Sequence, residues 1–276
     1  MAERGTARGF SLIEMMVAMA IGMVLLVAVA QLFYGNRQAS QTQDELASMQ
    51  ETARFALLML GREIRMAGMK RTESTGTFSA ANPMITGTNA TVGAPNSSDE
   101  VTVRYWGSDN AAGTAADNTV INCVGYGTRI NEQVTDRFYI ANNASGEPSL
   151  FCQSTNPTTL VVTNNELVPG VESMQILAGV DTDGDNSPNT YLQWNDPAMN
   201  LDNVVSVRVS LLLRSNNNIL TTATSSIFNH FGVAYAPSNV APALDLGAVF
   251  NPTGATLDRR MRRLYGSTIT VRNRVN

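Results

Sequence analysis

The chain has 276 residues, of which 43% are hydrophobic, so it is long enough to form one substantial core. Its formal net charge is −4, which argues against bulk nucleic-acid binding, and we expect no nucleic-acid partner. The sequence contains no Walker, Rossmann, nucleophile-elbow or zinc-binding pattern, and therefore does not predict an enzyme.

The chain begins with a short, polar, positively charged segment, residues 1–9. Residues 10–30 are then apolar except for Ser11 and Glu14, and as a helix they would measure roughly 32 Å, enough to cross a bilayer's hydrocarbon core. A secretory signal has its small-residue cleavage site after the apolar region, whereas Gly9 comes before it. Cleavage after Gly9 would leave the anchor on the mature protein, and the positive leader predicts that the C-terminal body crosses the membrane.

The carboxylate of Glu14 is unusual in an apolar helix, where it costs roughly 2.5–3.5 kcal/mol at the bilayer centre. Such a group needs a cation or a proton, yet residues 10–34 contain no Lys, Arg or His. Cleavage after Gly9 creates one cation, the α-amino group of Phe10. That amine can pair with Glu14 within one chain or between the chains of an assembly.

The stretch from Gly9 through Phe10 to Glu14, followed by the apolar run, resembles the prepilin peptidase motif of type IV pilins and type II secretion pseudopilins. The resemblance implies that prepilin peptidase cuts the bond after Gly9 and that the new N-terminal Phe10 is N-methylated. It also implies that Glu14 helps subunits to register in the filament. An ordinary signal anchor with an incidental glutamate is the alternative, but it does not explain why charge, glycine, glutamate and hydrophobic length coincide.

The helix is expected to continue well beyond the apolar run. Residues 1–82 contain no proline, and apolar residues recur at spacings of three and four while polar and charged residues fill the opposite face. We expect one helix from near Ser11 to near Gly68. Residues 10–30 form its transmembrane or filament-core half, and residues 31–70 form an amphipathic half that packs on the head.

Residues 71–276 are expected to form a β-rich head. Alternating β-forming residues predict strands at 101–106, 120–126, 137–140, 160–163, 173–180, 204–214 and 267–272. In the 204–214 strand, the apolar residues from Val205 to Leu213 are expected to face one way and the polar residues the other, with Leu212 as an exception. Residues 222–256 predict long loops, and a basic turn at 259–263 precedes the last strand.

Three head segments resemble blocks of PilW-like minor pilins: residues 171–185, 204–214 and 262–274. The resemblance implies an α+β fold in which a long N-terminal helix packs on a β-rich pilin-like head, one helix–sheet domain with long loops. It implies an inner-membrane protein with a periplasmic head that acts at the pilus tip. Its partners would be other minor pilins, the major pilin and a large tip adhesin. With them it would help to start pilus assembly and so support twitching motility and adhesion.

Two other functions remain open on sequence grounds. A type II secretion pseudopilin of the J type has a related design and is the main alternative. A minor pilin for DNA uptake or adhesion, with a ligand site in the variable loops, is the weaker one.

Asp181, Asp183 and Asp185 place alternating carboxylates on a predicted loop, and carboxylate oxygens are the ligands that Ca²⁺ prefers. The loop lacks the glycine and the glutamate that an EF-hand needs at its sixth and twelfth positions. A solvated acidic turn closed by Gly184 and Pro188 is the alternative, and we favour it. No other cofactor is expected.

Cys123 and Cys152 are predicted to form a disulfide, because export leads to an oxidising compartment. The bridge would contribute roughly 3–4 kcal/mol in the chain-entropy model. Two separate buried thiols are the alternative.

His230 is the only histidine, and no cysteine or carboxylate cluster lies near it in the sequence, so it does not predict a metal or acid–base site. The arginines within residues 259–263 can face lipid headgroups, a neighbouring subunit or the acidic part of the same head. We expect the last of these.

Overall fold

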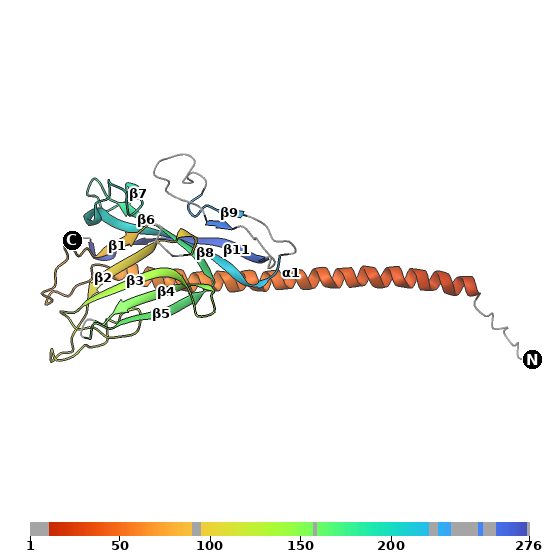
Figure 1. Cartoon of the computed structure of the whole chain (residues 1–276), viewed down its shortest axis with the longest axis horizontal. Helices are drawn as coiled ribbons and strands as arrows, with labels where there is room; N and C mark the ends of the chain where they lie inside the picture. The colour runs from red at the N-terminus through yellow and green to blue at the C-terminus, as the bar shows by residue number, and fades with distance from the viewer. Residues whose placement is uncertain are drawn as a thin grey trace, which may run out of the picture. The chain divides into compact units, whose positions relative to one another are not determined.

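The computed structural model describes residues 11–89, 95–156, 159–220, 226–232, 248–250 and 258–274. The chain separates into two compact units, Met1–Leu46 and Ala47–Asn276. Helix α1 (Leu12–Met66) contributes to both units, and Figure 1 shows it with the strands of the head. These bounds confirm the single long helix expected from the sequence.

The C-terminal end of α1 is fixed by a glycine and by a distant side chain. Gly68 has a φ of 77°, a conformation that favours glycine and commonly ends helices. The side-chain amide of Asn273 donates hydrogen bonds to the carbonyls of Arg65 at 3.0 Å and Ala67 at 3.1 Å. Carbonyls in the last turn have no partner within the helix, so Asn273 satisfies groups that would otherwise need water.

The described part of the head contains two main antiparallel sheets and one short strand pair. The five-stranded sheet has the order β1-β2-β3-β4-β5 and consists of β1 (Ile85–Thr88), β2 (Glu100–Trp106), β3 (Gln133–Asn142), β4 (Pro148–Thr155) and β5 (Val162–Pro169). The four-stranded sheet has the order β11-β8-β6-β7 and consists of β6 (Val171–Val180), β7 (Thr190–Leu192), β8 (Val204–Asn218) and β11 (Arg260–Thr270). The pair consists of β9 (Ser226–Phe228) and β10 (Ala248–Phe250). Short 3₁₀ turns occur at η1 (Pro95–Ser97), η2 (Leu201–Asn203) and η4 (Arg272–Arg274).

One hydrophobic core joins both sheets to the second half of α1. The helix contributes a face of buried residues at helical spacing, as predicted: Met49, Ala53, Ala56, Leu60, Ile64 and Ala67. The sheets contribute large buried side chains, among them Phe138, Ile140, Met174, Ile176 and Leu211. One expectation for the helix is wrong, because Glu63 lies on this buried face and is only 1% exposed.

Strands β6 and β8 are buried on both faces, which differs from the two-faced strand expected at 204–214. Ser206 and Ser210 alternate with the apolar residues, yet both serines are buried. They lie on the face opposite the apolar side chains, since side chains alternate along a strand. Another segment covers part of this face, because the ring of His230 hydrogen-bonds to Ser210.

Several predicted strands need correction. The strand expected at 120–126 is a loop, in which Asn122 and Tyr126 close a tight turn around Gly125, whose φ is 93°. The strand expected at 160–163 begins later, at Val162, because Leu160 has a φ of 57° that no regular strand adopts. Strands β1, β4 and β7 were not predicted. The strands expected at 101–106, 137–140 and 173–180 are confirmed as parts of β2, β3 and β6.

The basic turn expected at 259–263 is wrong as well, because strand β11 already begins at Arg260. The arginine side chains find acidic partners, so a strand can accommodate them. The expected loops at 222–256 lie mostly outside the described residues, and the described part of that stretch includes β9 and β10.

Candidate functional site

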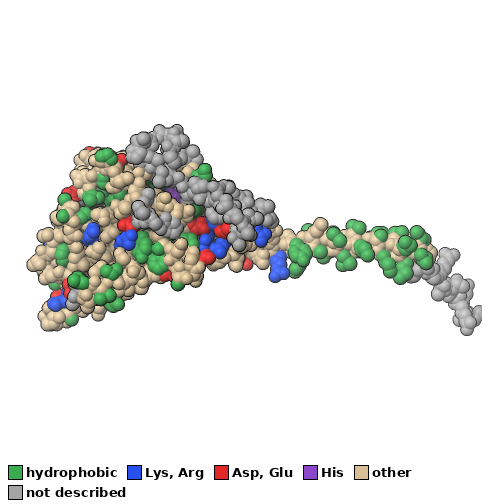
Figure 2. All heavy atoms as spheres, viewed as in Figure 1, with side chains coloured by type: hydrophobic (Ala, Val, Ile, Leu, Met, Phe, Trp, Pro, Cys, Tyr) green, Lys and Arg blue, Asp and Glu red, His purple; other side chains and the backbone are tan. Residues whose placement is uncertain are grey.

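The first half of α1 carries an exposed apolar surface. Large apolar side chains here are mostly exposed, for example Leu12 at 79%, Leu26 at 70% and Phe33 at 66%. An 18-residue window of the helix has a mean hydropathy of 2.6, and none of it is buried. Figure 2 shows these hydrophobic side chains in green. A helix of this length and composition can cross a membrane.

Glu14 lies in the first turn of this helix and forms a reciprocal pair with Ser11. The backbone N–H of Ser11 donates to the Glu14 carboxylate at 2.9 Å, and the backbone N–H of Glu14 donates to the Ser11 hydroxyl at 3.3 Å. This is a capping box, which satisfies two N–H groups that lack partners at a helix start. The Ser-x-x-Glu spacing was visible in the sequence and could have predicted it.

The processing residues Gly9 and Phe10 lie outside the described residues. The expected pairing between the Phe10 amine and Glu14 therefore stays a prediction.

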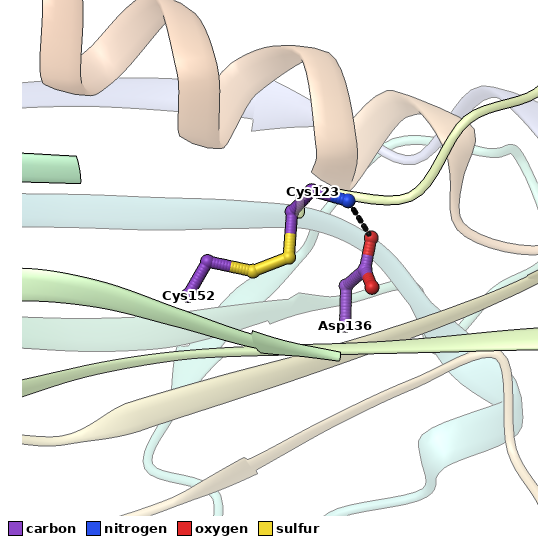
Figure 3. A group of neighbouring side chains, drawn as sticks. All are labelled: Cys123, Asp136 and Cys152. Carbon is purple, nitrogen blue, oxygen red and sulfur yellow. Dashed lines mark hydrogen bonds between the residues drawn. A yellow bond between two sulfur atoms is a disulfide. The ribbon is translucent and has the colours of Figure 1, made fainter. Parts of the chain in front are cut away.

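Cys123 and Cys152 form the predicted disulfide, with their Cα atoms 6.3 Å apart. The bond ties the loop between β2 and β3 to strand β4. Figure 3 shows that the backbone N–H of Cys123 also donates to the carboxylate of Asp136, at 2.9 Å. Both sulfurs are used by the bridge, so this group of two cysteines and an aspartate is not a thiolate metal site.

Asp136 belongs to a buried acidic cluster that sequence reasoning missed. The hydroxyl of Tyr105, on β2, lies 2.8 Å from the carboxylate of Asp136, on β3, and 3.1 Å from the carboxylate of Glu63, on α1. All three side chains are almost fully buried. Burial, with the neighbouring Asp136 charge, raises the pKa of Glu63 to about 7, and burial raises the pKa of Asp136.

The position of Glu63 gives a signal that could have revealed this cluster. Glu63 follows the buried Leu60 by three residues and precedes the buried Ala67 by four, so it falls on the apolar face of the helix.

The three aspartates of the candidate Ca²⁺ loop lie close together, with ligand atoms within 4.8 Å of one another. The carboxylate of Asp181 already accepts backbone hydrogen bonds from Asp183, Gly184 and Asn186. These donors, that of Gly184 first, hold the pKa of Asp181 below its ordinary value. The loop is thus a self-bonded acidic turn with Gly184 at a φ of 84°, and Ca²⁺ binding stays an untested prediction.

His230 is buried between two serines. Its Nδ1 lies 3.0 Å from the hydroxyl of Ser210 on β8, and its Nε2 lies 3.0 Å from the hydroxyl of Ser173 on β6. Burial lowers the pKa of His230 to about 4, so the ring is neutral at pH 7. The histidine therefore acts as a polar cross-link on the covered face of the four-stranded sheet.

Two of the C-terminal arginines, Arg260 and Arg262, join an ionic cluster within the head, as expected, whereas Arg259 and Arg263 are exposed. Arg262 forms two hydrogen bonds with the carboxylate of Glu172, at 2.6 and 2.8 Å, and one with Asp258 at 2.7 Å. Arg260 pairs with Glu147 at 2.8 Å, and Arg214 pairs with both Glu147 and Glu172. Because Glu147 belongs to the turn between β3 and β4, the cluster links the two sheets.

Comparisons with known proteins found two family models that match parts of the chain. A family model described as type IV pilus-assembly protein W, PilW, matches residues 137–273. A prokaryotic N-terminal methylation motif matches residues 4–30. Among solved structures, the type IV-like pilin TTHA1219 from Thermus thermophilus is 15% identical, with 86% of this chain and 100% of that chain covered and a TM-score of 0.43. No curated protein matches the chain.

An apolar N-terminal helix that begins with a methylation motif and packs on an antiparallel-sheet head defines a type IV pilin-like protein. Within that class, the matches to the PilW family model and to the methylation motif support a PilW-like minor pilin. The motif implies processing by a prepilin peptidase and association with other pilins. The apolar helix is consistent with an inner-membrane anchor.

Proposed function

We propose that this protein is a minor pilin that helps to start type IV pilus assembly. It does so in a tip complex with other minor pilins and a large tip adhesin, and thereby supports twitching motility and adhesion. The main support is the match of residues 137–273 to a family described as a pilus-assembly protein. The role is structural, since assembly uses the packing surface of the helix and needs no reaction.

The exposed apolar surface of the first half of α1 needs a cover both before and after assembly. Lipid covers this surface while the subunit is in the inner membrane, and neighbouring helices cover it in the assembled pilus. The head faces the periplasm before it reaches the pilus tip. The positive leader and the disulfide both suit that orientation, because positive segments stay cytoplasmic and disulfides form in oxidising compartments.

A minor rather than a major subunit is favoured by the size of the head. The compact unit Ala47–Asn276 is bulky, and a head of that size is hard to repeat along a thin fibre. The major pilin would then add behind the initiating complex.

Deletion of the gene tests the proposal, with complementation by the wild-type gene as control. We expect surface pili and twitching to fall sharply while type II secretion continues. Loss of type II secretion with normal piliation would overturn the proposal in favour of a J-type pseudopilin.

A further inference from the structure

Where α1 contacts the five-stranded sheet, two buried carboxylates, those of Glu63 and Asp136, face a single hydroxyl group, that of Tyr105. The single hydroxyl hydrogen of Tyr105 faces Glu63 at 3.1 Å, Asp136 at 2.8 Å and the carbonyl oxygen of Ile121 at 3.3 Å. One hydroxyl donates one hydrogen bond, so it cannot serve both carboxylates. If both acids were ionised, one buried carboxylate oxygen would face a phenol lone pair.

We propose that Glu63, Tyr105 and Asp136 form a buried proton-binding site, which holds one extra proton on Glu63 and fastens the second half of α1 to the head. With that proton in place, the hydrogen bonds run in one direction. The Glu63 carboxyl donates to the Tyr105 oxygen, and the Tyr105 hydroxyl donates to the Asp136 carboxylate. Asp136 also accepts the backbone N–H of Cys123 at 2.9 Å. Each of these three hydrogen bonds then has one donor and one acceptor.

The proton belongs on Glu63 rather than on Asp136 because the two acids have different neighbours. Asp136 receives the short bond from Tyr105 and the backbone N–H of Cys123, and hydrogen bonds to a carboxylate favour its charged form. Within the part of the chain that the structure describes, Glu63 has one ion-pair partner besides its contact with Tyr105. This partner is the guanidinium of Arg62, at 3.8 Å, whose side chain is 50% exposed. An exposed arginine at this distance is screened by water and stabilises a buried charge weakly.

Deprotonation should loosen the helix from the head. Burial and the Asp136 charge raise the pKa of Glu63 to about 7, above the ordinary value of about 4.3 that holds in the unfolded chain. A raised pKa means that the folded state binds the proton more tightly. The stabilisation is therefore complete below the unfolded pKa and is lost as the pH rises through about 7.

The test compares the full chain in detergent micelles with Glu63→Gln, which keeps a neutral hydrogen-bond donor at the same position. His230 titrates with the opposite sign at acidic pH, so the informative quantity is the difference between wild type and Glu63→Gln at each pH. Relative to the variant, the unfolding equilibrium constant of wild type should rise on the order of tenfold between pH 5.5 and 8.5. Glu51→Gln is the matched control, because Glu51 lies on the same helix with a side chain that is 67% exposed. Glu51→Gln should keep the wild-type dependence of the unfolding equilibrium constant on pH. If wild type and Glu63→Gln showed the same pH dependence, the proposal would be overturned.

Infrared spectroscopy keeps the test decisive if Glu63→Gln folds poorly. The wild-type chain should show the carbonyl stretch of a protonated carboxylic acid near neutral pH, and this band should disappear as the pH rises above 8. Absence of the band in wild type overturns the proposal. A band that is lost in Asp136→Asn but kept in Glu63→Gln also overturns it, since the proton would then reside on Asp136.

Discussion

The Glu14 carboxylate accepts the backbone N–H of Ser11 at 2.9 Å, so the acid that an apolar helix should avoid caps the start of that helix. The capping box gives Glu14 a local partner in the separate subunit. After cleavage, the Phe10 amine of the same chain or of a neighbour becomes a second partner. Opposite charges 4 Å apart interact by roughly 4 kcal/mol at an effective dielectric of 20, before desolvation is subtracted.

Glu14→Ala should insert into the membrane at least as well as wild type, because a polar group leaves the apolar helix. It should nevertheless recruit partner minor pilins poorly, and pilus number should fall. Glu14→Asp should be intermediate, since the charge remains but its reach is shorter. Co-purification of partner pilins from membranes, with a count of surface pili, measures both effects.

Ser11→Ala is the control for this prediction. It removes the capping hydroxyl, which costs about 0.5–2 kcal/mol of helix stability, but it keeps the carboxylate. We expect near-normal piliation. If Ser11→Ala and Glu14→Ala reduce piliation equally, the helix cap rather than the charge is what assembly requires.

Processing gives a second prediction. The mature N-terminus should be an N-methylated Phe10, because the methylation motif spans residues 4–30 and includes the bond after Gly9. Mass spectrometry of the membrane-derived protein identifies that terminus, and a strain without prepilin peptidase should keep the leader. An intact leader in a strain with active peptidase would contradict the prediction.

The sequence predicted the long helix and most of the central strands because these elements have strong periodicity. It failed at 120–126, where β-forming residues lie in a loop held by Cys123 and turned at Gly125. It also failed at Arg260, because a run of arginines suggests a solvated turn when the partners, Glu147 and Glu172, are distant in sequence. Local pattern does not reveal which distant groups will meet.

The candidate site likewise contains residues that the sequence could predict and residues that only the fold brings together. Gly9, Phe10 and Glu14 form a local motif, so sequence alone could predict them, and their roles stay predictions. The cluster at Tyr105 brings together three residues from α1, β2 and β3, so only the fold could reveal it.

Removal of the disulfide should destabilise the head. The double substitution Cys123→Ser and Cys152→Ser frees a loop closed over a sequence separation of 29, which costs roughly 3–4 kcal/mol. Denaturant unfolding of the full chain in micelles measures this loss. Alkylation of denatured, non-reduced wild type should modify neither cysteine, and full alkylation of periplasmic protein would rule out the bridge.

The ionic cluster predicts that substitution of Arg262 and substitution of its neighbour Arg263 lower the stability of the head by very different amounts. Arg262→Met should cost roughly 3 kcal/mol, because it leaves the buried carboxylate of Glu172 short of its main partner. Arg263→Met changes an exposed residue of the same strand and should have little effect. Unfolding free energies of both variants test this.

A double variant sharpens that comparison. Adding Glu172→Met to Arg262→Met should recover part of the lost stability, since the unpaired buried charge is then removed. Equal stability of the single and double variants would show that lost packing, not an unpaired charge, explains the effect.

The burial of the His230 ring predicts that the head loses stability at acidic pH. Burial lowers its pKa to about 4, whereas the unfolded chain binds the proton with the ordinary value of about 6.5. The contribution of the neutral ring is therefore complete above pH 6.5 and is lost as the pH falls toward 4, a change on the order of 2 to 3 kcal/mol. The measurement belongs in a Glu63→Gln background, where the titration of opposite sign is absent. In that background, His230→Asn should flatten the dependence of the unfolding free energy on pH between pH 4.5 and 6.5. It should also lower the unfolding free energy at pH 7.5, because at least one hydrogen bond to Ser173 or Ser210 is lost. An unchanged acid limb in His230→Asn would assign the acid sensitivity to other groups in the head.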